Sequence, residues 1–222
     1  LELIEVYSVL EEGLSEEERD YVGRFKSAID FDRIADDLNG ILSSMNLGST
    51  RSASLIDEMR VLFIPGARIV RLPANPVEAT EQSIQIFRDR FGAEVDFVIS
   101  NNVTVDEVAC PKTAFIRVLD NLLINAVHAC RAGADSRVSV SLESNPLTGD
   151  VTVAVSDNGV GIPDEVKPRL FEPYFSTREA AGGTGLGLAI VRKIIRDYEG
   201  ELDFESVEGQ GTTFRFTVPI RK

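Results

Sequence analysis

The sequence predicts an α+β protein, a two-layer α/β sandwich preceded by an N-terminal helical hairpin. Residues 1–66 are mostly helical in pattern, because apolar side chains recur at spacings of three and four. Residues 67–222 instead mix helix-like segments with stretches in which apolar and polar residues alternate, as in half-buried strands. A connector over residues 64–77 carries three prolines, which disfavour helix in the residues before them. We therefore predict two domains that meet near residue 66.

Composition narrows the class of protein. The 222 residues suffice for one or two domains with a substantial core, and the formal net charge is −13. That charge argues against a nucleic-acid surface, which needs clustered lysine and arginine. No apolar run approaches a membrane span, no signal peptide is visible, and Cys110 and Cys130 lack metal-site spacing. We expect two buried thiols in a reducing cytosol, and so a cytoplasmic location for this portion. Because the chain begins at Leu1, we also expect a fragment of a longer protein.

The first domain is expected to be a pair of helices. Residues 1–14 form one periodic apolar segment, and Ser15 with Glu18 has the spacing of a capping box that starts the next helix. From there the apolar stripe continues to about Phe63, with a break near residues 30–32 or near residues 48–50. Two stripes of this length need a partner surface to cover them.

The second domain contains the segments that define the sandwich. Helices are expected over 78–91, 113–132, 163–170 and 188–198. Strands are expected over 95–100, 137–143, 151–156, 201–207 and 212–218, and residues 68–72 are a further candidate. We expect turns at Asn101–Asn102 and over residues 145–150, the second of which makes a hairpin of the strands beside it.

Polar side chains interrupt the longest of these helices along one edge. Asn121 and Asn125 are four residues apart, and His128 follows three residues later, so the three share a face. Two amides and an imidazole on an otherwise apolar helix need a polar partner. An asparagine oxygen can help to hold Mg²⁺, which keeps several waters and takes few protein ligands.

Two glycine-rich stretches follow. Asp157-Asn-Gly159-Val-Gly161 comes directly after a β-branched strand, where a carboxylate can accept a hydrogen bond from a ligand amine. The segment 182–187 contains four glycines and opens a helix, an arrangement that presents free N–H groups to phosphate. A dinucleotide-binding loop would need a strand running into this segment, and a Walker A loop would need Gly-Lys-Ser/Thr. Neither is present.

Five stretches in this order closely resemble the ATP-binding domain of sensor histidine kinases, within the GHKL ATPase superfamily. They correspond to its N, G1, F, G2 and G3 elements: Asn121–Ala126, Asp157–Gly161, Phe171–Thr177, Gly182–Gly187 and Gly209–Pro219. The resemblance covers about residues 78–219. It implies a Bergerat-type ATP-binding fold, with one mixed sheet and three main helices on one of its faces.

The resemblance also implies a role for individual residues. Asn125 is the expected Mg²⁺ ligand, beside Asn121, and Asp157 the expected acceptor for the adenine amine. Gly159 and Gly161 would shape the adenine pocket, with Thr212 or Thr213 ordering its base end. The backbone amides of Gly185, Leu186 and Gly187 would lie near the phosphates.

Four further positions belong to this implied site. Phe171 and Phe175 would flank a mobile lid over about residues 176–184. Arg178 in that lid would either contact a phosphate or remain exposed. His128 would face the phosphates or sit at the edge of the core, and its place three residues after Asn125 argues against its being the phosphorylated histidine.

The implied function is that of a kinase core. It would bind Mg-ATP and pass the γ-phosphate to a histidine, then to a response regulator receiver domain, with the N-terminal helices pairing two chains into a homodimer. A monomeric helical cap is the alternative for those helices. The chain lacks the family's phosphoacceptor histidine, so we expect truncation, and a membrane association only through spans upstream. A non-catalytic ATP-binding adaptor remains open, whereas an ATP-hydrolysing clamp is disfavoured because Asn121 stands where its general-base glutamate would be.

Overall fold

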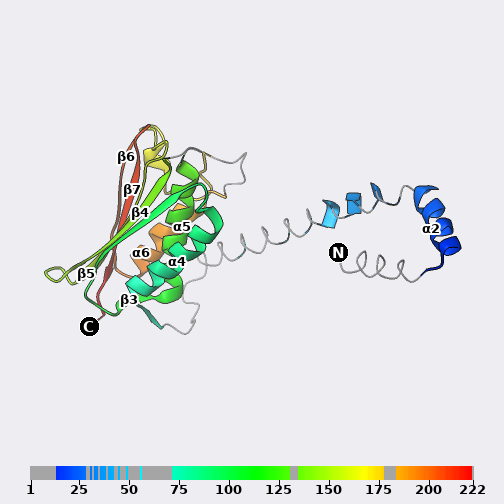
Figure 1. Cartoon of the computed structure of the whole chain (residues 1–222). Helices are drawn as coiled ribbons and strands as arrows, with labels where there is room; N and C mark the ends of the chain where they lie inside the picture. The colour runs from blue at the N-terminus through cyan, green and yellow to red at the C-terminus, as the bar shows by residue number, and fades with distance from the viewer. Residues whose placement is uncertain are drawn as a thin grey trace. The chain divides into compact units, whose positions relative to one another are not determined.

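The computed structural model describes residues 14–28, 72–130, 135–177 and 184–221, together with isolated positions between 31 and 56 (Figure 1). Its contacts divide the chain into two units, residues 1–57 and residues 58–222. The predicted boundary near residue 66 lies outside the described residues and stays a prediction. No helix among the described residues is long and apolar enough to cross a membrane.

In the first unit, helix α2 (Glu16–Ala28) begins with the predicted capping box. The Ser15 backbone N–H and Oγ both donate to Glu18 Oε2, at 2.9 and 2.7 Å, and the Glu18 N–H donates to Ser15 Oγ at 3.5 Å. The described positions between 31 and 56 are also helical. Most of the predicted hairpin, including the helix over residues 1–14, lies outside the described residues.

The second unit is built on a five-stranded sheet in the order β2-β4-β5-β7-β6. The strands are β2 (Asp96–Asn102), β4 (Arg137–Asn145), β5 (Asp150–Asp157), β6 (Leu202–Val207) and β7 (Gly211–Pro219). The β2–β4 pair is parallel and the other three pairs are antiparallel, so the sheet is mixed, as predicted. The short strands β1 (Pro73–Ala74) and β3 (Val108–Pro111) form a separate antiparallel pair.

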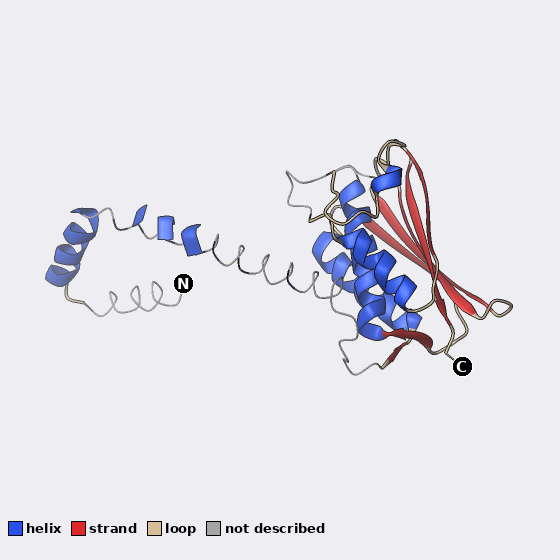
Figure 2. Cartoon of the chain, turned by 180° about the vertical axis from the view of Figure 1, so that it is seen from behind, coloured by secondary structure: helices blue, strands red, loops and turns tan. Residues whose placement is uncertain are grey.

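Helices α4 (Pro76–Phe91), α5 (Lys112–Ala129) and α6 (Gly187–Asp197) lie together on one face of this sheet (Figures 1 and 2). The start of α4 is well determined by its sequence, since Asn75 Oδ1 accepts from the N–H groups of Val77 and Glu78, and Pro76 has no N–H group that needs an acceptor. The predicted two-layer sandwich with three main helices is therefore confirmed.

The core lies between the two layers. Alternate residues of the central strands face the helices and are buried: Val138, Val140 and Leu142 in β4, Val151, Val153 and Val155 in β5, and Phe214, Phe216 and Val218 in β7. They pack on the apolar face of α5, where the rings of Phe115 and Phe216 meet edge to face with 5.7 Å between centroids. Helix α5 is thus held rigidly against the sheet, and its polar edge is left for other contacts.

Several predicted boundaries were wrong. Asn101 and Asn102 end strand β2 and pair with Leu142 and Glu143, because parallel pairing to a long neighbour extends the strand past its apolar residues. Only Lys167–Arg169 of the helix predicted over 163–170 is helical, as one 3₁₀ turn, and α5 ends at Ala129.

The small β1–β3 pair was not predicted at all. The candidate strand over residues 68–72 lies outside the described residues except for Leu72, which is not in a strand.

The ring of Phe216 gives the first testable prediction. Phe216 is 1% exposed, so Phe216→Ala should leave a cavity and lower the free energy of unfolding by about 3–5 kcal/mol. Urea denaturation followed by circular dichroism measures the loss. The control is Leu147→Ala in the β4–β5 turn, where the side chain is 95% exposed and the change should stay within about 0.5 kcal/mol. Similar losses in both variants would contradict this description of the core.

Candidate functional site

The polar edge of α5 meets the start of α6. Asn121 Nδ2 donates to the Arg117 carbonyl at 2.7 Å, which orients the amide and turns Oδ1 toward α6. A Cβ added to Gly187 would lie 2.7 Å from Asn121 Oδ1, closer than such contacts allow. Two stretches more than sixty residues apart in sequence, the asparagine helix and the glycine-rich segment, therefore come together as predicted.

Asn125 lies one turn further along α5 and is half-buried. Its side chain makes no hydrogen bond to any residue that the structure describes, so its amide oxygen is available to a ligand. An amide oxygen is a hard donor of the kind that Mg²⁺ accepts. The described ranges contain no group of three or more His, Cys, Asp or Glu placed to hold a metal.

His128 is exposed in the last turn of α5, one turn past Asn125. Residues 121, 125 and 128 thus follow one edge of the helix, as their spacing predicted. The exposure places the imidazole at the rim of the site rather than in the core.

Asp157 is the last residue of β5, where it is paired with Val138 on one side and Thr212 on the other. The Gly159 N–H donates to Asp157 Oδ1 at 2.9 Å. Burial raises the pKa of Asp157 above its ordinary value, and the backbone N–H groups of Gly159 and Thr212 offset part of that rise. The carboxylate is a partly desolvated acceptor at the end of a rigid strand.

The turn after Asp157 is clamped from both sides. The Val160 N–H donates to the Ala129 carbonyl at 2.9 Å, and a Cβ on Gly159 would lie 2.2 Å from that oxygen. On the other side the Gly209 N–H donates to the Val160 carbonyl at 2.7 Å. Gly161 has a φ of 67°, with room for no side chain because the Val207 carbonyl would lie 2.1 Å from its Cβ.

Strand alternation separates the two candidate threonines. Thr212 lies on the same side of the sheet as Asp157, and its Oγ1 is 2.9 Å from Ser206 Oγ, which accepts from the Ile162 N–H at 2.8 Å. Thr213 points to the opposite face, where its Oγ1 donates to Ser156 Oγ at 2.8 Å. The structure therefore places Thr212, and not Thr213, beside the Asp157 turn.

Sequence reasoning missed the serine that completes this group. Ser206 is directly opposite Thr212 in the β6–β7 pair. The signal that could have found it is the register of that hairpin, which one sequence alone does not give.

The two ends of the predicted lid are held together. The Tyr174 N–H donates to the Gly185 carbonyl at 3.0 Å, and both residues have a φ of 66°. A Cβ on Gly185 would lie 2.5 Å from the Tyr174 carbonyl carbon, so only glycine permits this approach. Arg178 lies outside the described residues, and its predicted role stays a prediction.

The two phenylalanines before the lid are anchored differently. Phe171 packs edge to face on Phe204, with 5.8 Å between centroids, and its carbonyl accepts from Arg192 Nη2 at 3.1 Å. The Arg169 guanidinium lies over the ring of Phe175, 4.3 Å from its centroid. Phe171 ties the segment to β6 and α6, while Phe175 lies beside an arginine at the lid's first end.

The start of α6 lacks a side-chain cap. Leu186, the N-cap residue, is fully buried, and its N–H donates to Thr184 Oγ1 at 3.3 Å. Among the described residues, no side-chain cap bonds to the backbone N–H groups of the first turn. These groups and the positive end of the helix dipole can receive an anion next to Asn121 and Asn125.

Known proteins share this arrangement. Residues 111–222, more than half of the chain, match the family described as histidine kinase-, DNA gyrase B- and HSP90-like ATPases. The sensor protein kinase WalK of Staphylococcus aureus is 38% identical over 82% of this chain, and the sensor histidine kinase ZraS of Salmonella typhimurium is 33% identical over 61%. The chain spans 49% and 28% of the lengths of these two proteins.

Solved structures of histidine kinases resemble this chain in fold. The catalytic domain of the histidine kinase ThkA matches 68% of this chain and 97% of its own, with 30% identity and a TM-score of 0.58. Full-length ShkA covers 94% of this chain at 20% identity with a TM-score of 0.67, a likeness of fold alone. The chain therefore belongs to the family of histidine kinase-, DNA gyrase B- and HSP90-like ATPases. Within that family, the described second unit is a histidine kinase ATP-binding domain.

The buried carboxylate of Asp157 gives a pH-dependent prediction. Because its pKa is raised in the folded protein, its contribution to stability is present below the pKa of the unfolded chain and is lost as pH rises through the folded value. Asp157→Asn removes the buried charge, so the variant should gain stability relative to the parent as pH rises from acid to neutral. Urea denaturation over a series of pH values measures this difference.

The control for that experiment has the opposite sign. Asp164 is fully exposed, and its hydrogen bond with Lys167 lowers its pKa. Asp164→Asn should therefore lose stability relative to the parent as pH rises. An Asp157→Asn difference that does not vary with pH would rule out a raised pKa at this site.

Proposed function

We propose that this chain is the kinase core of a two-component sensor histidine kinase. It binds Mg-ATP, and the γ-phosphate is transferred to a histidine outside this chain for relay to a response regulator receiver domain. One observation carries the proposal. Asn121 Oδ1 lies against Gly187, so the amide edge of α5 and the uncapped start of α6 form one surface, while the clamped Asp157 turn adjoins the end of the same helix.

The base would bind at the Asp157 end of the site. The carboxylate accepts from the adenine amine, and the backbone around Gly159 and Gly161 forms the flat wall of the pocket. Thr212 supports this end through Ser206. The carboxylate favours a ligand with a donor at this position, because burial removes part of its solvation and the N–H groups of Gly159 and Thr212 replace only some of it.

The phosphates would bind at the other end. The backbone at Gly185, Leu186 and Gly187 and the dipole of α6 favour negative charge there, and the Leu186 N–H, which donates to Thr184 Oγ1 in this structure, would exchange that partner for a phosphate oxygen. Asn125 would hold Mg²⁺, with His128 at the rim and Arg178 as a contact from the lid. The bound cation would supply charge neutralisation for phosphoryl transfer. The role of the chain's own residues is to orient the nucleotide and to exclude water from it.

The same geometry favours transfer over hydrolysis. Asn121 cannot act as a general base, because an amide does not take a proton at neutral pH. Its Nδ2 is also committed to the Arg117 carbonyl, and its oxygen lies against Gly187. A glutamate at position 121 would place a longer side chain against Gly187 at the start of α6, so the site does not readily accept the general base of a hydrolase.

The N-terminal helices would pair with a second copy of the chain. The exposed apolar residues in the described part of that unit support such a pairing, since they form a helical stripe: Ile34, Leu38, Ile41, Leu42 and Met45. Cys110 and Cys130 are both free thiols, which fits a reducing cytoplasm. Any attachment to a membrane would come from segments upstream.

A second candidate is a non-catalytic ATP-binding adaptor. It is favoured by one observation, the lack of any histidine other than His128 in the chain. The intact base and phosphate ends of the site favour the kinase.

Nucleotide binding tests the site directly. Isothermal titration calorimetry should give micromolar-range binding of Mg-ADP. Asp157→Ala should abolish it, because the amine loses its buried acceptor. Asn125→Ala should remove only the part of the affinity that depends on Mg²⁺. Asn102→Ala, on an exposed strand end, is the control. Unchanged binding in Asp157→Ala would refute the base assignment, and an unchanged Mg²⁺ dependence in Asn125→Ala would refute the metal assignment.

Phosphate release separates kinase from hydrolase. The chain saturated with γ-labelled ATP should release phosphate very slowly and acquire no acid-labile label, because both a general base and the acceptor histidine are missing. Rapid release would favour an ATP-driven clamp. Acid-labile label on His128 would show that the acceptor was misassigned.

A further inference from the structure

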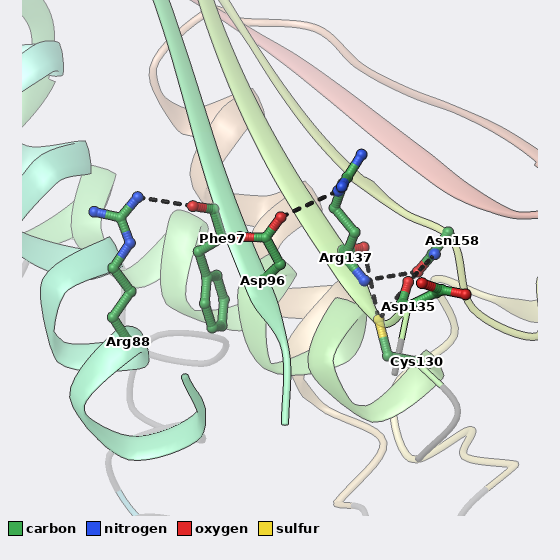
Figure 3. A network of polar contacts seen from close by, with 7 residues as sticks. All are labelled: Arg88, Asp96, Phe97, Cys130, Asp135, Arg137 and Asn158. Carbon is green, nitrogen blue, oxygen red and sulfur yellow. Dashed lines mark hydrogen bonds and ion pairs between the residues drawn. The ribbon is translucent and has the colours of Figure 1, made fainter. Parts of the chain in front are cut away.

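Asn158 lies between the two residues that the proposed site uses for the base, and none of the roles above involves it. Both polar atoms of its side chain make hydrogen bonds (Figure 3). Oδ1 accepts from the Arg137 backbone N–H at 2.8 Å, and Nδ2 donates to the Asp135 carbonyl at 2.6 Å. The Asn158 backbone N–H donates to the Arg137 carbonyl at 3.3 Å. A single residue thus fastens the turn after β5 to the segment that opens β4.

These hydrogen bonds allow the β4–β5 ladder to end without leaving a backbone N–H group unpaired. The β4–β5 ladder ends with Val138 opposite Asp157, so Arg137 is the next residue to need partners. Asn158 Oδ1 takes the place of a backbone carbonyl in accepting from Arg137, and the chain can leave the ladder without orphaning that N–H. The backbone is then free to turn at once, which brings the Gly159 N–H to Asp157 Oδ1.

The same side chain also reaches the end of α5. Cys130, which caps that helix, directs Sγ to Asn158 Oδ1 at 3.8 Å and to the Arg137 carbonyl at 3.7 Å (Figure 3). Next to it, the Val160 N–H donates to the Ala129 carbonyl. The Arg137–Asp96 ion pair at 3.2 Å is largely exposed and contributes little. The rigid part of the network is therefore Asn158 with the backbone of β4 and the last turn of α5.

We propose that Asn158 is the positioning residue for base selectivity, an inference that rests on the proposed function. By holding the turn, it keeps the Asp157 carboxylate where a purine 6-amino group donates to it. A 6-oxo purine presents a carbonyl oxygen to that carboxylate, and two acceptors facing each other repel. The purine is rejected only if the carboxylate is held in place, because a carboxylate that can move away or admit a water molecule relieves the repulsion. Rigidity at residue 158 is what makes Asp157 a discriminating acceptor.

The test compares ATP with inosine triphosphate, which carries a carbonyl oxygen in place of the amine and a proton on N1, so that a carboxylate free to move could accept from N1–H instead. Calorimetric Kd values for both, with Mg²⁺, give a discrimination ratio for each protein. The parent chain should prefer ATP. In Asn158→Ala the ratio should fall by roughly tenfold, the effect of loosening one charge-assisted hydrogen bond. Loss of folding alone would lower both affinities by the same factor and leave the ratio unchanged.

Asn145→Ala is the matched control. Asn145 ends the same strand β4, and its Oδ1 also accepts two backbone bonds, from the N–H groups of Leu147 at 3.0 Å and Thr148 at 3.4 Å. The Asn145→Ala variant loses a comparable set of hydrogen bonds at the opposite end of β4. Its discrimination ratio between ATP and inosine triphosphate should therefore match that of the parent chain.

Asn158→Asp covers the case in which the alanine variant does not fold. Aspartate keeps an acceptor for the Arg137 N–H but loses the donor to the Asp135 carbonyl, so its ratio should lie between those of the parent and Asn158→Ala. An unchanged ratio in every folded Asn158 variant would overturn the inference and leave the proposed function intact. A parent chain that binds neither triphosphate would overturn the proposed function and the inference with it.

Discussion

The hydrogen bond from the Val160 N–H to the Ala129 carbonyl, at 2.9 Å, joins the two halves of the site. It ties the last turn of α5 to the turn after β5, and it leaves no space for a side chain at Gly159. Helix α5 cannot shift in response, because Phe115, Leu119 and Leu122 are buried against the sheet. The asparagines to which we assign the metal and the aspartate to which we assign the base are therefore carried by one rigid body.

That rigidity keeps the Asp157 carboxylate in a position where its ionised form is unfavourable. Burial raises the pKa of Asp157, so the ionised carboxylate opposes folding at neutral pH. A looser turn would let the carboxylate rotate to water and recover its solvation. Stability and recognition thus make opposite demands on this residue, as they often do at functional sites. The clamps from Ala129, Gly209 and Arg137 keep the carboxylate from escaping to water.

The relative placement of the candidate residues could be predicted from sequence where motif and local geometry coincide. Asn121 and Asn125 share a face because of helical spacing alone, and Asp157 ends a strand because the β-branched run ends there. The assignment between Thr212 and Thr213 was undecidable, since adjacent strand residues face opposite sides and one residue of register exchanges them. Ser206 could not be predicted for the same reason, because the register of the β6–β7 pair decides that it lies opposite Thr212.

The sequence by itself determined the class of fold and the order of the helices and main strands, because periodicity and glycine-rich motifs are local, and it supplied the residues to which we assign the chemistry. Only the tertiary structure decided which glycines meet which backbone atoms, as in the contacts of Gly187 with Asn121 and of Gly185 with Tyr174. It also decided that Asn158 bonds to Asp135 and Arg137 rather than to solvent. Such contacts join residues distant in sequence, and their partners depend on how the helices and sheet pack.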